Sequence, residues 1–252
     1  MEIFDLTGKV ALITGASKGI GKDMGRVFRE AGASVVLSNR NQESLEEAAK
    51  DIDPEGNHVK AFAANAGKME DLEALVKFTT DSFGKVDILV NNAAANPVFG
   101  PVVNTPVSAF DKIMDVNVKG PFELSKLVAP SMKESGGGSI INISSIGGLT
   151  PEPMLGIYSV SKAALISLTK VLAKELGADG IRANVICPGL IKTKFSEALW
   201  SNEAITNHML GQLPISRIGT EEDISGLALF LASGASAYCT GGIFTADGGY
   251  TI

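Results

Sequence analysis

Tyr158 and Lys162 form the residue pair whose types and spacing point most directly to chemistry. They stand four positions apart at the start of a predicted helix, 158–176, so their side chains share one helix face. A phenol can exchange a proton with a carbonyl or alcohol oxygen, but a pKa of about 10 makes it a poor base at neutral pH. A nearby ammonium stabilises the phenolate, so we expect Lys162 to lower the pKa of Tyr158. The pair predicts general acid–base catalysis, and an exposed helix pair is the alternative.

Ser145 and Asn117 are two further polar candidates. Ser145 follows a short apolar run, 139–143, and its hydroxyl could hydrogen-bond a substrate oxygen and orient it toward Tyr158. Ser144 is the neighbouring candidate, although the spacing favours Ser145, and a serine after a strand also commonly satisfies local backbone groups. Asn117 lies in a predicted helix, where asparagine is intrinsically unfavourable, which hints at a specific purpose.

A glycine-rich stretch, Thr14–Gly21, follows the first apolar run and leads into a predicted helix. Glycines permit a tight turn and let the backbone approach a pyrophosphate, whose charge is attracted by free N–H groups at the helix start. The spacing Gly-x-x-x-Gly-x-Gly differs from the commoner Gly-x-Gly-x-x-Gly and lacks the Gly-Lys-Ser/Thr end of an ATP-binding loop. The stretch predicts a dinucleotide site, and a purely structural turn is the alternative. The expected cofactor-binding residues here are Gly15, Ser17, Lys18, Gly19, Ile20 and Gly21.

The elements that must position these residues alternate along the whole chain. Short apolar runs, rich in β-branched residues and apolar on both faces, are typical of strands covered by helices on either side. Their alternation with helical patterns predicts an α/β fold, a doubly wound parallel sheet of about seven strands in one domain, 1–252. Ligands of such sheets bind at the carboxyl ends of the strands. The expected strands are 10–13, 34–37, 59–63, 86–90, 139–143, 182–186 and 242–245, and the expected helices are 20–31, 43–50, 71–83, 109–133, 158–176 and 222–231.

Composition excludes several functional classes. The two cysteines, Cys187 and Cys239, exclude a disulfide scaffold and indicate a reducing compartment. No apolar run is expected to approach a membrane span, and the N-terminus lacks a signal pattern. A net charge of −6 disfavours nucleic-acid binding. His58 and His208 lack partners at metal spacing, so no metal site is expected. We expect a soluble, cytoplasmic protein in which Cys187 is a core residue.

The motifs together resemble the short-chain dehydrogenase/reductase family from Gly8 to Gly249. The matching segments, in family order, are Thr14–Gly21, Asn91-Asn92-Ala93-Ala94, Asn117, Ser145, Tyr158-x-x-x-Lys162 and Pro188-Gly189. The resemblance implies a Rossmann-like fold and hydride transfer between a nicotinamide cofactor and a carbonyl or alcohol. It implies that Tyr158, Lys162, Ser145 and Asn117 are catalytic. In the family pattern Lys162 also bonds the nicotinamide ribose, and Asn117 holds a water that links Lys162 to solvent. Further cofactor contacts are expected from Asn91, Ala93, Pro188, Gly189, Ile191 and Thr193, besides Tyr158 and Lys162.

The end of the second expected strand, Ser38-Asn39-Arg40, bears on the choice of cofactor. NAD-selective members carry an acidic residue there, which bonds the ribose 2′-hydroxyl and repels a 2′-phosphate. This chain has no carboxylate in that segment, and Arg40 can bind a phosphate with two hydrogen bonds. Lys18 occupies the position of a second base in phosphate-preferring relatives. Lys18, Arg40 and the missing carboxylate therefore favour NADP(H), with NAD(H) as the alternative. Asn39 and Arg40 are expected to contact the cofactor, and Asn65 stands where many relatives place an aspartate facing the adenine.

The region 190–213 is expected to form a substrate lid. Its apolar residues, Phe195 among them, and the largely uncharged loops 94–97 and 146–154 imply an apolar substrate. The expected pocket residues are Ala95, Ile146, Met154, Leu190, Leu199 and Trp200. Segments 91–100 and 189–200 resemble NADPH-dependent carbonyl and retinal reductases of the animal peroxisomal type, which reduce apolar aldehydes, ketones and dicarbonyls. Tyr250-Thr251-Ile252 does not match their Ser-Lys-Leu-like address, so peroxisomal residence is not expected.

Two other functions and one assembly remain open at this point. A 3-oxoacyl thioester reductase usually docks an acidic carrier protein through basic residues, whereas the stretch 133–139 is mostly glycine and serine. A non-catalytic NADP-sensing regulator typically lacks the active tyrosine, and here all four catalytic positions are filled. The resemblance implies a homotetramer, with 109–133, 158–176 and the final strand as interfaces.

Overall fold

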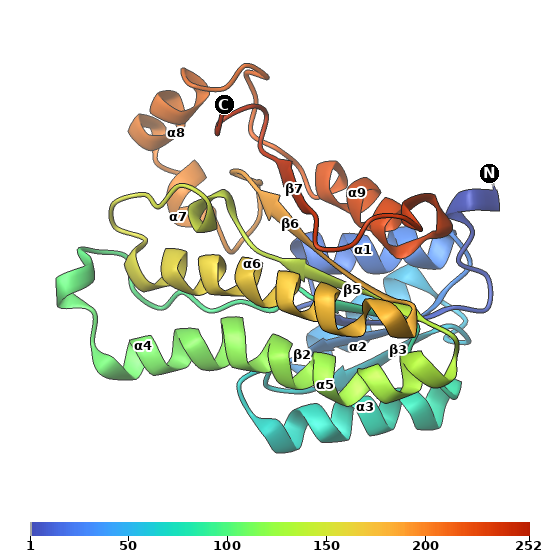
Figure 1. Cartoon of the computed structure of the whole chain (residues 1–252). Coiled ribbons are helices and arrows are strands. Elements are labelled where there is room, and N and C mark those ends of the chain that lie inside the picture. Colours follow the sequence, from blue (N-terminus) through green and yellow to red (C-terminus); the bar gives the residue numbers. More distant parts are fainter. Residues whose placement is uncertain (1) are drawn as a thin grey trace.

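A parallel seven-stranded sheet forms the centre of the molecule (Figure 1). The computed structural model describes residues 2–252, with the backbone alone for Ala198, Ala204 and Ile205. The strand order is β3-β2-β1-β4-β5-β6-β7, and every neighbouring pair is parallel. The strands are β1 (Val10–Thr14), β2 (Ser34–Asn39), β3 (Val59–Ala63), β4 (Ile88–Asn91), β5 (Gly138–Ile143), β6 (Ile181–Pro188) and β7 (Ile243–Ala246). This confirms the expected doubly wound sheet.

Helices cover both faces of the sheet (Figure 1). They are α1 (Gly19–Glu30), α2 (Gln42–Ile52), α3 (Met69–Phe83), α4 (Val107–Met114), α5 (Gly120–Glu134), α6 (Gly156–Leu176), α7 (Glu197–Trp200), α8 (Glu203–Leu210) and α9 (Glu222–Ala232). Ala11 and Ile13 of β1 belong to the core under α1, α2 and α9, whereas Leu12 belongs to the core under α3, α5 and α6. Because successive strand residues face opposite sides, a strand covered on both sides must be apolar throughout.

The strand order reverses at β1, which lies between β2 and β4. Connections leaving these strands diverge to opposite faces, and this opens a crevice at their carboxyl ends, where ligands of doubly wound sheets bind. The glycine-rich turn follows β1, and Ser145 follows β5 by two residues. Pro188 closes β6 at the same edge. The fold thus brings these candidate residues to one edge of the sheet.

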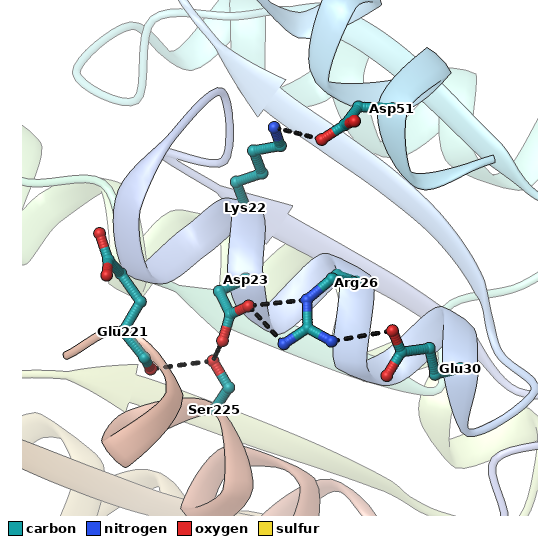
Figure 2. A network of polar contacts seen from close by, with 7 residues as sticks. All are labelled: Lys22, Asp23, Arg26, Glu30, Asp51, Glu221 and Ser225. Atoms are coloured by element: carbon teal, nitrogen blue, oxygen red, sulfur yellow. Dashed lines mark hydrogen bonds and ion pairs between the residues drawn. The ribbon is translucent and has the colours of Figure 1, made fainter. Parts of the chain in front are cut away.

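Polar contacts fix α1, the helix that follows the glycine-rich turn, against its neighbours (Figure 2). Asp23 Oδ1 accepts hydrogen bonds from Arg26 Nε at 2.9 Å and Nη2 at 2.7 Å. The buried hydroxyl of Ser225 in α9 donates to Asp23 Oδ2 and to the Glu221 carbonyl oxygen. Lys22 pairs with Asp51 of α2 at 2.6 Å. Asp23 and Ser225 form what we call the α1–α9 clasp, which holds the start of α1 in place.

The expected single helix 109–133 is interrupted by the π-helical turn η3 (Asp115–Lys119), which separates α4 from α5. A π-helical turn inserts an extra residue into the helical ladder, and such insertions often occur at functional sites. Asn117 lies in η3 and is fully buried. The departure from the expected helix therefore falls at one of the candidate catalytic residues.

The helical stretch Gly156–Asp179, which contains α6, is long and apolar enough to cross a membrane by length and composition, with a mean hydropathy of 1.2. The sequence-based expectation that no run approaches a membrane span is therefore wrong for this stretch. Half of it is buried inside the protein, and Leu172 and Ala173 belong to one core with Ile181 and Ala183 of β6. Packing against a parallel sheet accounts for its apolar character.

Candidate active site

Tyr158 and Lys162 lie side by side in the first turns of α6. The Lys162 ammonium lies 5.5 Å from the centre of the Tyr158 ring and donates a hydrogen bond to the Ile143 carbonyl oxygen at 2.7 Å. Only 9% of Tyr158 and 2% of Lys162 are exposed. The end of β5 thus anchors the lysine, and the lysine in turn lies against the phenol ring.

Burial sets the proton affinities of this pair. It raises the pKa of Tyr158 to about 12, and a hydrogen bond with Ser145 acts in the opposite direction. Burial also lowers the pKa of Lys162 to about 8. In the chain by itself the pKa of Tyr158 is thus raised and not lowered as expected, because burial is its largest cause and Lys162 is not among the causes. At neutral pH the phenol carries its proton and can donate it to a substrate oxygen.

The structure separates the roles of the two neighbouring serines. Ser145 hydrogen-bonds the Tyr158 side chain, and its Oγ also accepts from the Gly147 N–H at 3.1 Å. Ser144 Oγ instead donates to the Lys162 carbonyl oxygen at 2.9 Å. Ser145 is thus the serine beside the phenol, as the spacing favours, and it also caps the short helix η4 (Ile146–Gly148).

Asn117 joins the loop after β4 to α6. Its Oδ1 accepts from the Ala95 N–H at 2.7 Å, and its Nδ2 donates to the Ala95 carbonyl oxygen and to Ser161 Oγ, each at 3.0 Å. Ser161 Oγ donates onward to the Tyr158 carbonyl oxygen at 2.7 Å. Sequence reasoning missed Ser161, whose only signal is its place one turn after Tyr158. The family role of Asn117, holding a water, stays a prediction.

The glycine-rich turn forms a cradle that side chains would fill. A Cβ at Gly15 would lie 2.9 Å from the Ala93 Cα, and one at Gly21 would lie 2.5 Å from the Gly15 oxygen. Gly15 and Gly19 have φ values of +66° and +61°, which favour glycine. Asn92 Nδ2 donates to the carbonyl oxygens of Thr14 and Gly15, both at 3.0 Å. Asn92, which we did not single out from its motif, thus locks the turn to the loop after β4.

The residues expected at the adenosine end lie together after β2. Asn39 Nδ2 donates to Ser17 Oγ at 2.7 Å, and its Oδ1 accepts from the Arg40 N–H at 2.8 Å. Lys18 and Arg40 are exposed. Asn65 Oδ1 accepts from the Gly67 N–H at 3.0 Å, so its expected acceptor is already engaged within its own turn. The side-chain amide of Asn39 thereby fixes the backbone from which Arg40 projects.

Asn91 at the end of β4 has a side-chain amide of which only one of the two polar atoms is hydrogen-bonded. Its Nδ2 donates to Asn142 Oδ1 at 2.8 Å, whereas its Oδ1 is buried without a hydrogen-bond partner among the described residues. A buried polar atom without a partner is costly and points to a missing ligand or water. This oxygen and the glycine cradle fit a dinucleotide, and the donors and cations around the turn suit its phosphates.

The loop after β6 lies over the glycine-rich turn. Gly189 donates its N–H to the Ala246 oxygen at 3.0 Å, and the carbonyl oxygen of Ile191, a buried residue, accepts from Ser196. The Thr193 methyl lies 3.5 Å from the Cβ position of Gly19. An open cleft of about 390 Å³ lies here, lined by Lys18, Gly19, Lys192, Thr193, Lys194, Glu197, Trp200 and Glu221. Pro188, Gly189, Ile191 and Thr193 therefore border the expected cofactor region.

The expected substrate lid contains α7 and α8, which were anticipated only as an irregular segment. The lid residue that reaches the acid–base pair is Phe195, whose ring centre lies 6.1 Å from that of Tyr158. Trp200 instead lines the cleft beside the glycine-rich turn, together with Lys18. Trp200 and Leu199, which is half-buried on α7, stay predicted residues of the substrate pocket.

The remaining expected pocket residues come from three loops: Ala95 from the loop after β4, Ile146 and Met154 from the loop after β5, and Leu190 from the loop after β6. Ile146 is buried next to Ser145, and Leu190 accepts a hydrogen bond from the Gly219 N–H at 3.0 Å. Met154 has a φ of +74°, a strained conformation for a residue with a side chain. Its carbonyl oxygen accepts from the Gly100 N–H at 2.9 Å. Strained backbone conformations of this kind cluster at functional sites, which supports the prediction that Met154 lines the pocket.

Metal and thiol chemistry find little support in the described residues. Among them no group of three or more histidine, cysteine, aspartate or glutamate side chains could hold a metal ion. Cys187 is buried in β6, and burial raises the pKa of its thiol to about 11, which keeps it protonated and unreactive.

Comparisons with known proteins identify the family. A sequence model described as "Enoyl-(Acyl carrier protein) reductase" matches residues 15–251. Dehydrogenase/reductase SDR family member 4 of Sus scrofa is 43% identical over 244 residues, which are 97% of this chain and 88% of the relative. A putative short-chain alcohol dehydrogenase from Sinorhizobium meliloti aligns with a TM-score of 0.94 at 37% identity, covering 98% of each chain.

A 7α-hydroxysteroid dehydrogenase complexed with NADH and 7-oxo glycochenodeoxycholic acid also aligns with a TM-score of 0.94, at 38% identity, covering 98% of this chain and 96% of that chain. With the fold and the glycine cradle, these matches define the class: a single-domain Rossmann-like oxidoreductase that uses a nicotinamide cofactor. The chain belongs to the short-chain dehydrogenase/reductase family, as its motifs indicate.

Proposed function

We propose that the protein interconverts apolar ketones or aldehydes and the corresponding alcohols with NADP(H), and that Tyr158 is the general acid and base. One observation carries the proposal: a protonated, buried phenol is hydrogen-bonded to Ser145, with the centre of the Phe195 ring 6.1 Å and the Lys162 ammonium 5.5 Å from the centre of its ring. A carbonyl oxygen seated between the two hydroxyls would accept hydrogen bonds from both.

The residues divide the reaction among them. The bound nicotinamide supplies or accepts the hydride. Ser145 orients the substrate oxygen, and Tyr158 donates its proton as negative charge develops there, or accepts it when an alcohol is oxidised. Lys162 lies against the phenol and stabilises the phenolate left by proton transfer, because its pKa of about 8 keeps most of it charged at neutral pH.

The NADP(H) preference rests on charge at the adenosine end. Arg40 and Lys18 are exposed cations near the Ser17–Asn39 hydrogen bond, and the segment Ser38-Asn39-Arg40 has no carboxylate. An arginine can hold the 2′-phosphate of NADP through two parallel hydrogen bonds. The 2′-hydroxyl that NAD has at this position is uncharged, so it attracts the arginine less.

The apolar substrate rests on the residues that surround Tyr158. Phe195 and Met154 are exposed large hydrophobic residues on the expected walls. Glu152, the charged residue of the 146–154 loop, accepts a hydrogen bond from the Tyr250 hydroxyl at 3.2 Å, which engages its carboxylate. The 7-oxo compound bound by the 7α-hydroxysteroid dehydrogenase is a ketone on a steroid skeleton, and it supports a similar class of substrate here.

A panel of aldehydes and ketones, followed by nicotinamide absorbance at about 340 nm with NADPH and with NADH, tests the proposal. We expect turnover to rise with the apolar character of the carbonyl and to be faster with NADPH. Arg40→Ala should reduce the preference for NADPH over NADH. Equal rates with the two cofactors would contradict the preference.

A 3-oxoacyl thioester reductase is a second candidate. The description of the matching sequence model shares with it a carrier-linked acyl substrate, although an enoyl reductase reduces a carbon–carbon double bond and not a 3-oxo group. Against this candidate, Lys133 of the 133–139 stretch pairs with Asp179 at 2.7 Å, so its charge is engaged within the chain. Comparing a free ketone with a carrier-linked 3-oxoacyl thioester separates the two functions.

A non-catalytic NADP-sensing role predicts cofactor-dependent binding of a protein partner without turnover. The cytoplasmic location and the homotetramer remain predictions.

A further inference from the structure

The cleft beside the glycine-rich turn has three lysines in its lining, and of these the predicted cofactor site included Lys18 alone. Lys192 and Lys194 come from the loop after β6, and Lys18 comes from the turn itself. Glu197 and Glu221 also line the cleft, so its lining includes three lysines and two glutamates. Figure 2 shows the Glu221 carboxylate directed away from Asp23, while its backbone oxygen is held by Ser225. The balance favours an anion.

Lys192 is held at both ends, unlike an ordinary surface lysine. Its backbone N–H donates to the Gly219 oxygen at 2.8 Å. Its ammonium lies 5.5 Å above the centre of the Trp200 ring, within the range of a cation–π contact. The Trp200 Nε1 in turn donates to the Thr193 carbonyl oxygen at 2.7 Å. The indole therefore forms a platform, fixed to the loop backbone, on which the lysine side chain rests.

The platform lies close to the turn that is expected to approach a pyrophosphate. The Thr193 methyl lies 3.5 Å from the Cβ position of Gly19, the first residue of α1. An ammonium confined to this cleft loses less conformational freedom on meeting an anion than a freely rotating lysine would. The arrangement suits a diphosphate group bound between the turn and the loop after β6.

We propose that Lys192 binds the pyrophosphate of the dinucleotide and that Trp200 is its positioning residue. This inference rests on the part of the proposed function that says a dinucleotide binds. It does not depend on whether that dinucleotide is NADP or NAD. Both cofactors carry the same pyrophosphate, so Lys192 contributes equally to the binding of either. Arg40, by contrast, discriminates between them.

Binding measured by calorimetry with NADP⁺ and NAD⁺ tests Lys192 without any turnover. Lys192→Met should raise the Kd for both cofactors by a similar factor, about fivefold for a solvent-accessible charged contact. Lys194→Met is the matched control, because it removes the same charge from the same cleft without a ring contact, and it should change either Kd less than Lys192→Met does. Lys192→Met should also weaken the dependence of the Kd on salt.

The role of Trp200 is tested by a double-mutant cycle on the same measurement. Trp200→Leu should raise both Kd values, and it should add little in the Lys192→Met background. Trp200→Phe keeps an aromatic face and should retain much of the affinity. Thermal unfolding of each variant confirms that it is folded.

Equal Kd changes in Lys192→Met and Lys194→Met would overturn the assignment of Lys192. A loss limited to NADP⁺ would overturn it as well, because it would place Lys192 on the 2′-phosphate. An undiminished effect of Trp200→Leu in the Lys192→Met background would refute the positioning role. An unchanged NADP⁺/NAD⁺ affinity ratio in Arg40→Ala counts against the proposed cofactor preference alone, so the two failures are distinguishable.

Discussion

At the scale of single residues, the central feature is two titratable side chains buried against each other. Burial disfavours the charged form of each, which moves the pKa of Tyr158 up and that of Lys162 down. The price of removing Lys162 from water is partly offset by its hydrogen bond to the Ile143 oxygen. A substrate oxygen next to Tyr158 would therefore meet donors in a poorly solvated site, where hydrogen bonds are strong.

Replacing Tyr158 by phenylalanine removes the proton donor and keeps the ring. We expect kcat in Tyr158→Phe to fall about 10²- to 10⁴-fold, the usual contribution of a positioned acid or base. The Kd for NADP⁺ should change by a much smaller factor than kcat, because Tyr158 is one of many expected cofactor contacts. Steady-state kinetics and calorimetry on the same preparation check both, and unchanged turnover of every carbonyl tested would refute the catalytic role of Tyr158.

The burial of Lys162 predicts a pH dependence of stability. Between pH values of about 8 and 10, the unfolded chain holds a proton on this lysine that the folded chain has lost. The free energy of unfolding therefore rises with pH across that window, and the contribution is flat below it, where both states are protonated. The opposite effect of Tyr158 begins above pH 10, because its unfolded phenol ionises there and its folded one at about 12.

Lys162→Met isolates this effect. Relative to the variant, wild-type protein should gain about 1–3 kcal/mol of unfolding free energy from pH 7 to 10, an order-of-magnitude figure for a shift of this size. Denaturant titrations at several pH values measure the difference. Parallel curves for the two proteins would mean that Lys162 has the same proton affinity folded and unfolded.

Much of the candidate site is predictable at this scale, because motif spacing constrains which side chains share a helix face or a sheet edge. Tyr158, Lys162 and Ser145 come together as their spacing indicates. The position of Trp200 is not predictable in this way, since it depends on a hydrogen bond to Thr193 across a loop with no periodicity. The raised pKa of Tyr158 likewise depends on burial, which the sequence alone does not quantify.

At the scale of elements, the glycine-rich turn and α1 act as one unit. The turn needs backbone conformations and close approaches that only glycine provides, and Asn92 ties it to the loop after β4. The α1–α9 clasp holds the helix that follows. Cofactor binding therefore depends on an element whose shape is set before the cofactor arrives.

Gly15→Ala and Gly84→Ala separate conformational strain from the loss of the cradle. Both glycines have positive φ values, +66° and +84°, but only the Cβ at Gly15 meets other atoms. Both variants should lose roughly 1–2 kcal/mol of stability from the left-handed conformation. Only Gly15→Ala should also weaken binding of NADP⁺, which calorimetry measures. Equal binding by both variants would show that the turn tolerates a methyl group.

Ser225→Ala tests the α1–α9 clasp. Removing this buried hydroxyl leaves Asp23 Oδ2 without one partner, so we expect a loss of about 1–2 kcal/mol of unfolding free energy. Ser135→Ala, at an exposed serine after α5, is the control and should be neutral. Denaturant unfolding compares the two, and a neutral Ser225→Ala would mean that α1 and α9 hold together through apolar packing alone.

The sequence also predicts the regular elements well, because strands buried on both faces must be uniformly apolar and helices keep their own period. It does not predict η3, since one inserted residue leaves the surrounding helical pattern nearly intact. Nor does it predict α7, which is four residues long and carries too little periodicity to detect.

At the scale of the whole molecule, one side carries exposed apolar residues. Large hydrophobic side chains are exposed on α4, α5 and α6, at Val107, Phe110, Phe122, Val160 and Val171. These helices include the expected dimer faces, and an interface between copies of the chain would bury such exposed apolar side chains.

Phe122→Glu combined with Val171→Glu should therefore reduce the size of the assembly measured by analytical ultracentrifugation. A buried interface penalises unpaired charges, whereas solvent does not. Ile3→Glu, at an exposed hydrophobic residue outside these helices, is the control. Wild-type protein that sediments as a monomer would contradict the predicted homotetramer outright.

The strand order has a practical consequence for redesign. The glycine-rich turn is attached to β1 near the middle of the sheet, whereas the segments 146–154 and 190–213 leave β5 and β6 toward one side. The segments expected to form the substrate walls are thus separate pieces of chain from the turn expected to hold the dinucleotide. Grafting 201–213 from a relative should alter which carbonyls are accepted while Lys192 and Trp200 are retained. The chimera then inherits its coenzyme affinity from one parent and its selectivity from the other.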